Sequence, residues 1–174
     1  MNIEQNDIDT TWIENLALDE INMEESGIVN INEHLNPLHL LEESSIAFVE
    51  ELRDLFELYV TRFNECRSDS SKQHQIKFFK ISNTINDFML FRNSLKLVVA
   101  RRSDDVITIG FLSNSGGLFA ARLNNEETAS HKLHEIRAHV GTFNNIEWRF
   151  NGEKVDKHSL VKHYLSEFIR HSAR

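Results

Sequence analysis

A long run of apolar residues at helical spacing follows Pro37. These residues recur at intervals of three and four, which places them on one face of an α-helix. Asn36 and Pro37 favour a helix start, because an asparagine side chain can cap the first amides and proline fits the first helical position. We expect one helix that ends near 67–71, with an interruption at Ser44 and Ser45 as an alternative. A stripe this wide predicts packing across a sheet or against a second copy of the helix. Its members are Leu38, Leu41, Ser45, Phe48, Leu52, Leu55 and Tyr59, widened by Val49, Phe56 and Phe63.

The hydrophobic period changes from helical to alternating in the middle of the chain. Short apolar or alternating runs are separated there by clusters of small polar residues, which is typical of an antiparallel β-meander. In the third run one face of the strand is apolar and the other carries Val98 and Ala100 beside Lys96, so both faces of the sheet are expected to be partly covered. The apolar face consists of Leu95, Leu97 and Val99. The predicted strands are 76–81, 88–91, 95–101, 106–112 and 118–123.

Helical spacing returns after Asn125 and predicts a helix that ends at Gly141. Its apolar positions are Ala129, Leu133, Ile136 and Val140, and Glu126 and Glu127 stand at its favourable negative end.

A hairpin and a last helix complete the pattern. The dipeptide Asn151–Gly152 suits a two-residue turn between strands 146–150 and 153–155. The chain then closes with a helix over 156–171. We therefore predict an α+β fold, an antiparallel β-meander with a long helix before it, then a helix, a β-hairpin and a C-terminal helix.

This element order is similar to that of small acidic secretion chaperones and their relatives, which dimerise and hold segments of a partner. The similarity covers most of the chain and rests on element order, with no motif residues. It implies a homodimer with a protein-binding, chaperone-like function. Five strands before the second helix exceed the usual number in that fold, unless two of them form one bent strand.

The N-terminal segment pairs carboxylates with large apolar side chains. Thr11 and Glu14 have the spacing of a capping box at the start of a short helix over 10–25. We expect residues 1–35 to be an acidic, marginally ordered segment, joined near Gly27 to a single α+β domain over 36–174. A segment of this kind can fold on a partner's groove, whereas docking on its own domain explains the pattern slightly better. The predicted partner-binding residues here are Trp12, Leu16 and Ile21.

Charge is distributed unevenly along the chain, whose net charge is −8. Through Glu57 there are 15 acidic residues and one basic residue, whereas from Leu58 onward there are 18 basic and 12 acidic residues. The split indicates that the acidic part covers the basic part, or that the two recognise different partners. A solvated acidic helix face is an equally good explanation.

Nucleic-acid binding is the main alternative to protein binding. Region 71–123 contains eight basic and three acidic residues, interleaved with phenylalanines that could stack on bases. We predict a basic patch at Arg101 and Arg102. The competing interpretation places the phenylalanines in the core and the cations on the outer rows.

Catalytic and metal-binding patterns are weak. His134 and His139 are five residues apart, so a regular helix rotates them about 140° from one another and they cannot share one zinc ion. His131 and His134 could bind a metal only with a third ligand. A metal-dependent nuclease of the restriction-endonuclease-like fold needs Glu-x-Lys, and the nearest triplet is Glu147-Trp148-Arg149. We expect no catalytic residue, no metal and no cofactor.

Length and cysteine content bound the class of protein. A chain of 174 residues can bury a core as one domain. Its single cysteine, Cys66, cannot form an internal disulfide, and neither a secretory leader nor an apolar run of about 18 residues occurs. We therefore expect a soluble cytoplasmic protein with no membrane segment. The predicted function is a non-catalytic, protein-binding adaptor or accessory subunit of a larger complex, with self-association into a homo-oligomer as one form.

Overall fold

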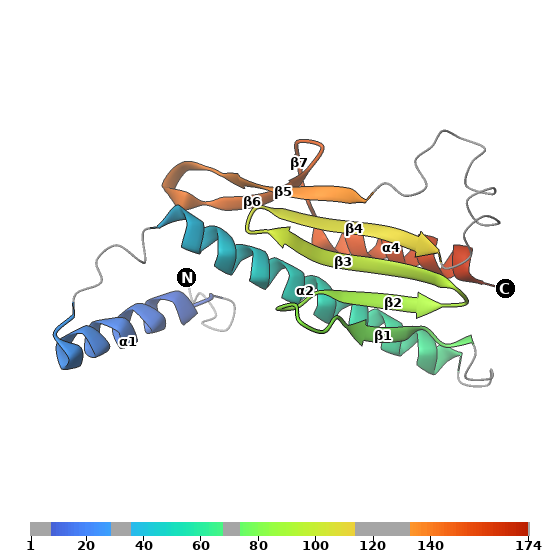
Figure 1. The fold of residues 1–174 in the computed structure, drawn as a ribbon, viewed down its shortest axis with the longest axis horizontal. Coiled ribbons are helices and arrows are strands. Elements are labelled where there is room, and N and C mark those ends of the chain that lie inside the picture. The colour runs from blue at the N-terminus through green and yellow to red at the C-terminus, as the bar shows by residue number, and fades with distance from the viewer. Residues whose placement is uncertain (1–7, 29–35, 68–73, 114–132, 174) are drawn as a thin grey trace, which may run out of the picture. The chain divides into compact units, whose positions relative to one another are not determined.

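The computed structural model describes residues 8–28, 36–67, 74–113 and 133–173 (Figure 1). The chain divides into two units, Met1–Asn36 and Pro37–Arg174. Over the described ranges it forms three α-helices and a seven-stranded antiparallel sheet, so the predicted α+β class is confirmed. No helix within these ranges has both the length and the hydrophobicity needed to cross a membrane.

The first unit contains the helix α1 (Thr11–Ser26). Its N-cap is Thr10, whose hydroxyl donates to a carboxylate oxygen of Glu14 over 3.0 Å instead of capping a backbone amide. The carboxylate of Asp9 accepts from the Thr11 N–H, also over 3.0 Å. The predicted capping box was therefore wrong, because Thr11 is already the first helical residue and cannot be the cap.

The second unit begins with the helix α2 (Pro37–Cys66), which runs without the interruption considered at Ser44 and Ser45. The Ser45 hydroxyl donates to the Glu42 carbonyl oxygen over 2.7 Å, so this polar side chain is satisfied inside the helix–sheet interface. The predicted stripe is confirmed at its centre, whereas its members Leu38 and Tyr59 are exposed. The buried residues of the helix are Ser45, Phe48, Val49, Leu52, Phe56 and Val60.

All seven strands form one meander, in which each strand pairs antiparallel with the next. The first four predicted strands are confirmed, whereas the predicted strand 118–123 lies outside the described residues. The strands are β1 (Lys77–Lys80), β2 (Phe88–Arg92), β3 (Leu95–Ser103), β4 (Val106–Ser113), β5 (His134–Val140), β6 (Ile146–Phe150) and β7 (Glu153–Lys154).

Strand β5 corrects the helix predicted to end at Gly141. Ile136 pairs with Ile107 of β4 and is buried, while its neighbours Glu135 and Arg137 are exposed. The segment thus alternates with period two and hydrogen-bonds to strands on both sides. At 134–140 the chain therefore departs from the secretion-chaperone order of elements, because it forms a strand where the second helix was expected. Residues 125–132 of the predicted helix lie outside the described residues.

The C-terminal prediction is confirmed. Asn151 and Gly152 have φ values of 50° and 85°, and the flanking Phe150 and Glu153 pair directly, as a two-residue turn between antiparallel strands requires. The helix α4 (Lys157–Ser172) follows, and the carboxylate of Asp156 caps it.

Helices α2 and α4 lie on the same face of the sheet, behind the strands in Figure 1. They enclose the core between themselves and the inward side chains of the strands. Phe56 of α2 meets Phe88 of β2 with ring centroids 5.6 Å apart. The opposite face of the sheet is not covered by either helix.

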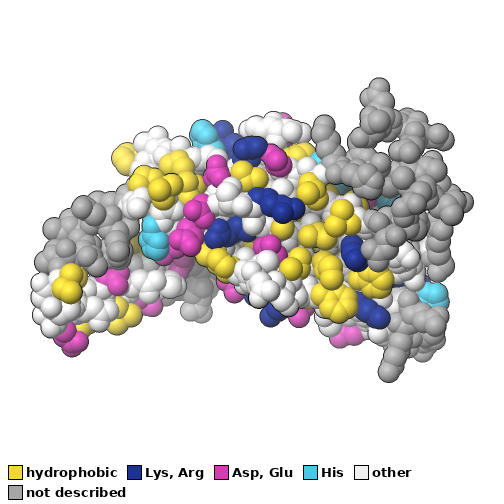
Figure 2. Space-filling model, viewed as in Figure 1, with side chains coloured by type: hydrophobic (Ala, Val, Ile, Leu, Met, Phe, Trp, Pro, Cys, Tyr) yellow, Lys and Arg dark blue, Asp and Glu magenta, His cyan; other side chains and the backbone are white. Residues whose placement is uncertain are grey.

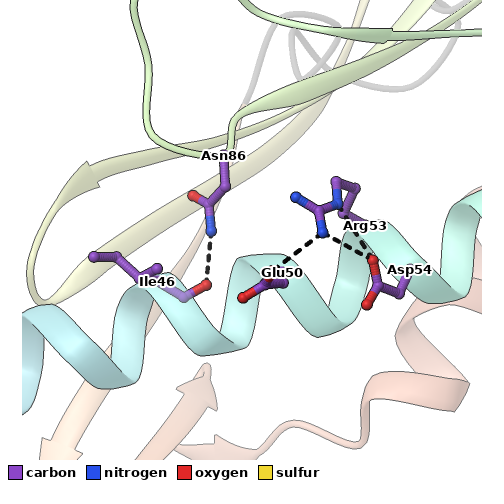
Figure 3. A network of polar contacts seen from close by, with 5 residues as sticks. All are labelled: Ile46, Glu50, Arg53, Asp54 and Asn86. Atoms are coloured by element: carbon purple, nitrogen blue, oxygen red, sulfur yellow. Dashed lines mark hydrogen bonds and ion pairs between the residues drawn. The ribbon is translucent and has the colours of Figure 1, made fainter.

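A polar contact ties the β1–β2 connection to α2 (Figure 3). The buried side chain of Asn86 donates to the carbonyl oxygen of Ile46 over 2.7 Å. Nearby on α2, Arg53 pairs with Glu50 and Asp54 at 3.2 and 3.0 Å, and the hydrogen bond that it donates to Asp54 raises the pKa of the guanidinium. The hydrogen bond between Asn86 and Ile46 fixes this edge of the sheet against the long helix.

Candidate interaction surfaces

Helix α1 presents large apolar side chains to solvent. Trp12 and Leu16, four residues apart, lie on one side with exposed fractions of 62% and 41%. Ile21 is 50% exposed but lies five residues beyond Leu16, a rotation of about 140°. Sequence reasoning missed Met23, which the seven-residue step from Leu16 returns to the same side. We call Trp12, Leu16 and Met23 the anchor face.

The same helix is strongly acidic and holds none of its side chains in a core. Among its described residues none is buried. A helix of this length is marginal in water without tertiary packing. Its charged residues are all carboxylates: Glu14, Asp19, Glu20, Glu24 and Glu25.

The structure separates the two arginines that the sequence grouped. Arg101 pairs across the sheet with the core residue Ile107, and its largely covered guanidinium forms an ion pair of 2.8 Å with Asp104. Arg102 is exposed and its Nε donates to the hydroxyl of Thr108 over 3.3 Å. The pairing register between β3 and β4 shifts between Arg101 and Ser103. The two arginines therefore differ in surroundings, one ion-paired and largely covered and the other exposed.

The sheet face opposite α2 and α4, which we call the open sheet face, carries apolar side chains among cations (Figure 2). One cross-strand row runs Lys77, Phe91, Lys96 and Leu112 over β1 to β4. The next row runs Phe79, Met89, Val98 and Gly110. Lysines thus stand on both sides of Phe91.

The cations at the other end of the open sheet face are paired. Arg137 forms an ion pair with Glu135, and Arg149 forms one of 3.0 Å with Glu147. The hydrogen bond from Arg149 holds the pKa of the Glu147 carboxyl below its usual value. The strands β1 to β4 carry no carboxylate, so the carboxylates of this face stand on β5 and β6.

A cavity of about 270 Å³ lies between α4 and the strands β5 to β7. Nδ1 of His134 is hydrogen-bonded there to the hydroxyl of Tyr164, and the His134 ring packs 5.3 Å from that of Phe150. Burial raises the pKa of Tyr164 to about 12, so its phenol is neutral at physiological pH. The apolar lining of the cavity includes Ile136, Val155 and Leu160. The histidine that the sequence offered as a metal ligand thus joins a strand to a helix.

Arg92 is a buried cation that sequence reasoning also missed. Its guanidinium contacts the Ile169 carbonyl oxygen and the Ser172 hydroxyl, each over 3.4 Å, at the C-terminus of α4. It also lies 5.4 Å from the ring centre of Phe63. Burial lowers its pKa. A cation at this position satisfies helix-end carbonyls and favours the negative end of the helix dipole.

Metal-ligating side chains do not gather anywhere in the described part of the chain: no three of histidine, cysteine, aspartate and glutamate lie close enough to hold an ion. His131 is outside the described residues, so the predicted His131–His134 pair has no structural account. Cys66 is exposed at the end of α2.

Comparison with known proteins adds no family to these observations. No protein-family model, curated protein or solved structure matches the chain.

Proposed function

We propose that this protein is a non-catalytic adaptor that binds another protein through α1. The observation that carries the proposal is the anchor face, in which Trp12 and Leu16 are exposed and Met23 is half-buried, on a helix whose charged residues are all acidic. Amphipathic helices commonly lay such anchors into a groove of a partner. Binding to a partner would give these solvent-facing apolar side chains of α1 a direct use.

The chemistry of α1 defines the groove that would receive it. The anchor face requires an apolar floor with room for an indole ring, and the carboxylates around it favour a rim of lysine and arginine. Tryptophan is enriched among the residues that dominate binding energy, because its large ring is desolvated as a unit. Trp12 is therefore expected to contribute most to affinity.

The test compares two faces of the same helix in the full-length chain. The anchor variant is W12A/L16A, and the matched control is L18A/I21A, which removes the same number of exposed apolar side chains from other sides of α1. A partner captured by the wild-type chain is purified, and its affinity for each variant is measured. The buried Trp148 reports by fluorescence that each variant is folded.

We expect the anchor variant to bind at least about thirtyfold more weakly, the effect of losing one dominant interface residue. The control is expected to stay within about threefold of wild type, and rising salt should weaken binding to the basic rim. Equal losses in both variants would indicate unspecific adhesion. A wild-type dimer that W12A/L16A converts to monomer would assign the face to a second copy of the chain instead.

A further inference from the structure

We propose that the open sheet face binds single-stranded nucleic acid, with Phe79 and Phe91 stacking on bases and Lys77 and Lys96 contacting phosphates. This inference goes beyond the adaptor function, since it concerns a different surface and a different class of ligand.

The arrangement of rings and lysines carries the proposal. Phe91 of β2 pairs with Lys77 on one side and Lys96 on the other, and neighbouring strands lie about 4.8 Å apart. Both ammonium groups can therefore reach a phosphate beside a base that rests on this ring. Phe79 stands in the adjacent row, opposite Met89, and is 42% exposed. Aromatic rings on neighbouring strands of an open sheet are a known platform for two or three successive bases.

The electrostatics of the second unit permit a polyanion to approach this face. Lys77 and Lys96 have no ion pair with any residue that the structure describes, whereas Arg137 and Arg149 are each paired with a glutamate. Helix α2, which carries many of the acidic residues of this unit, lies on the other side of the sheet (Figure 1). The carboxylates of α2 are Glu42, Glu43, Glu50, Glu51, Asp54, Glu57 and Glu65.

The rings decide between a nucleic acid and an acidic peptide. Lysines alone would also bind a carboxylate-rich peptide. The apolar side chains of such a peptide, however, need grooves into which they can insert. A planar base needs a flat aromatic surface with cations beside it, which the alternation of Lys77, Phe91 and Lys96 provides. The ring contribution should therefore be separable from the charge contribution.

The experiment measures fluorescence anisotropy of a labelled oligothymidylate of about 12 nucleotides, within the site sizes of single-strand binders. Full-length protein is titrated between about 50 and about 200 mM salt. The variants are F79A, F79Y and K77A/K96A. The matched control is K154A/K162A, which removes two exposed lysines from β7 and α4. Trp148 fluorescence confirms that each variant is folded.

We expect wild-type binding that weakens with salt, and a loss of about tenfold or more in K77A/K96A. The slope of log K against log salt should fall by about 1.4 in that variant, because each phosphate contact on a single strand contributes about 0.7. F79A should weaken binding about tenfold with an unchanged slope, since one base stack is lost, while F79Y should bind like wild type. K154A/K162A should change neither quantity.

Three results would overturn the proposal. The first is no binding at the lowest salt, and the second is an equal loss in K154A/K162A and K77A/K96A, which would mean unspecific attraction to cations. The third is that polyglutamate binds as tightly as the oligonucleotide, depends on Lys77 and Lys96, and is indifferent to F79A. That pattern would assign the open sheet face to an acidic protein segment.

Discussion

The hydroxyl of Tyr164 in α4 is hydrogen-bonded to Nδ1 of His134 in β5, and the two rings meet edge to face with centroids 5.9 Å apart. Burial raises the pKa of Tyr164 to about 12 from its ordinary value of 10.0. In a Y59F variant, which leaves Tyr164 as the only tyrosine, ultraviolet absorbance should therefore show no phenolate until well above pH 10. Ionisation centred at pH 10 would contradict this.

The same shift predicts how alkali affects stability. The unfolded chain loses the Tyr164 proton near pH 10, while the folded chain keeps it to about pH 12. The free energy of unfolding should therefore be unaffected by this group below pH 10 and should fall as the pH rises from 10 toward 12. Urea titrations of wild type and Y164F across this range check the sign, because the variant should lack this contribution to the decline.

Because Gly110 and Leu133 approach each other closely, position 110 should not tolerate a β-branched side chain. A Cβ atom at Gly110 would lie 2.7 Å from Cδ2 and 3.2 Å from Cα of Leu133. We expect G110V to lower the free energy of unfolding by about 1–3 kcal/mol, as overpacking typically does. Adding L133A should restore part of the loss, which a double-mutant cycle in urea measures. Full additivity would show that the two sites do not interact.

Phe56 should be among the most sensitive core positions of α2. It is fully buried and packs on the ring of Phe88. We expect F56A to cost about 3–5 kcal/mol in unfolding free energy, through lost transfer energy and the cavity that remains. The exposed Leu58 of the same helix is the control, and L58A should stay within about 0.5 kcal/mol of wild type. Similar losses in both would refute the assigned burial.

The Asn86–Ile46 hydrogen bond should hold the β1–β2 connection on α2. Replacing Asn86 by alanine removes a buried donor, so N86A should lower the free energy of unfolding by about 1–3 kcal/mol. The neighbouring Thr84 makes an exposed hydrogen bond to Ile81, and T84A should cost less. Hydrogen exchange should accelerate at β1 in N86A before it does at β3. Unchanged protection at β1 would argue against the tether.

The N-cap of α4 should contribute to the loss of folding stability at acid pH. The Asp156 carboxylate accepts from the Ser159 N–H over 2.8 Å, and hydrogen bonding to the side chain and backbone of Ser159 lowers its pKa from 3.8. A lowered pKa stabilises the fold above pH 3.8, and the benefit is lost as the pH falls through the folded-state value. D156A should lower the melting temperature at neutral pH and reduce this acid-dependent loss. D156N, a neutral cap, should retain most of the melting temperature.

Local signals determined several elements before any tertiary contact is considered. The apolar stripe and Pro37 predict α2, Asn151–Gly152 predicts the last hairpin, and the Asp156 region predicts the start of α4. In each of these, the deciding interactions join residues a few positions apart, such as a cap or a turn with positive φ. The common side of Trp12 and Leu16 on α1 also follows from the sequence, because residues four apart share a face in any helix.

Tertiary structure decided what short-range patterns leave ambiguous. The residues Leu133, Ile136 and Val140 fit helical spacing, yet 134–140 forms β5, since pairing with β4 and β6 supplies backbone hydrogen bonds on both sides and buries Ile136. Arg101 forms a largely covered ion pair with Asp104 while the adjacent Arg102 is exposed, a difference that residue type alone does not predict. His134 meets Tyr164 only because β5 lies beneath α4. Contacts between residues thirty positions apart depend on the assembled sheet, and a one-dimensional pattern does not contain them.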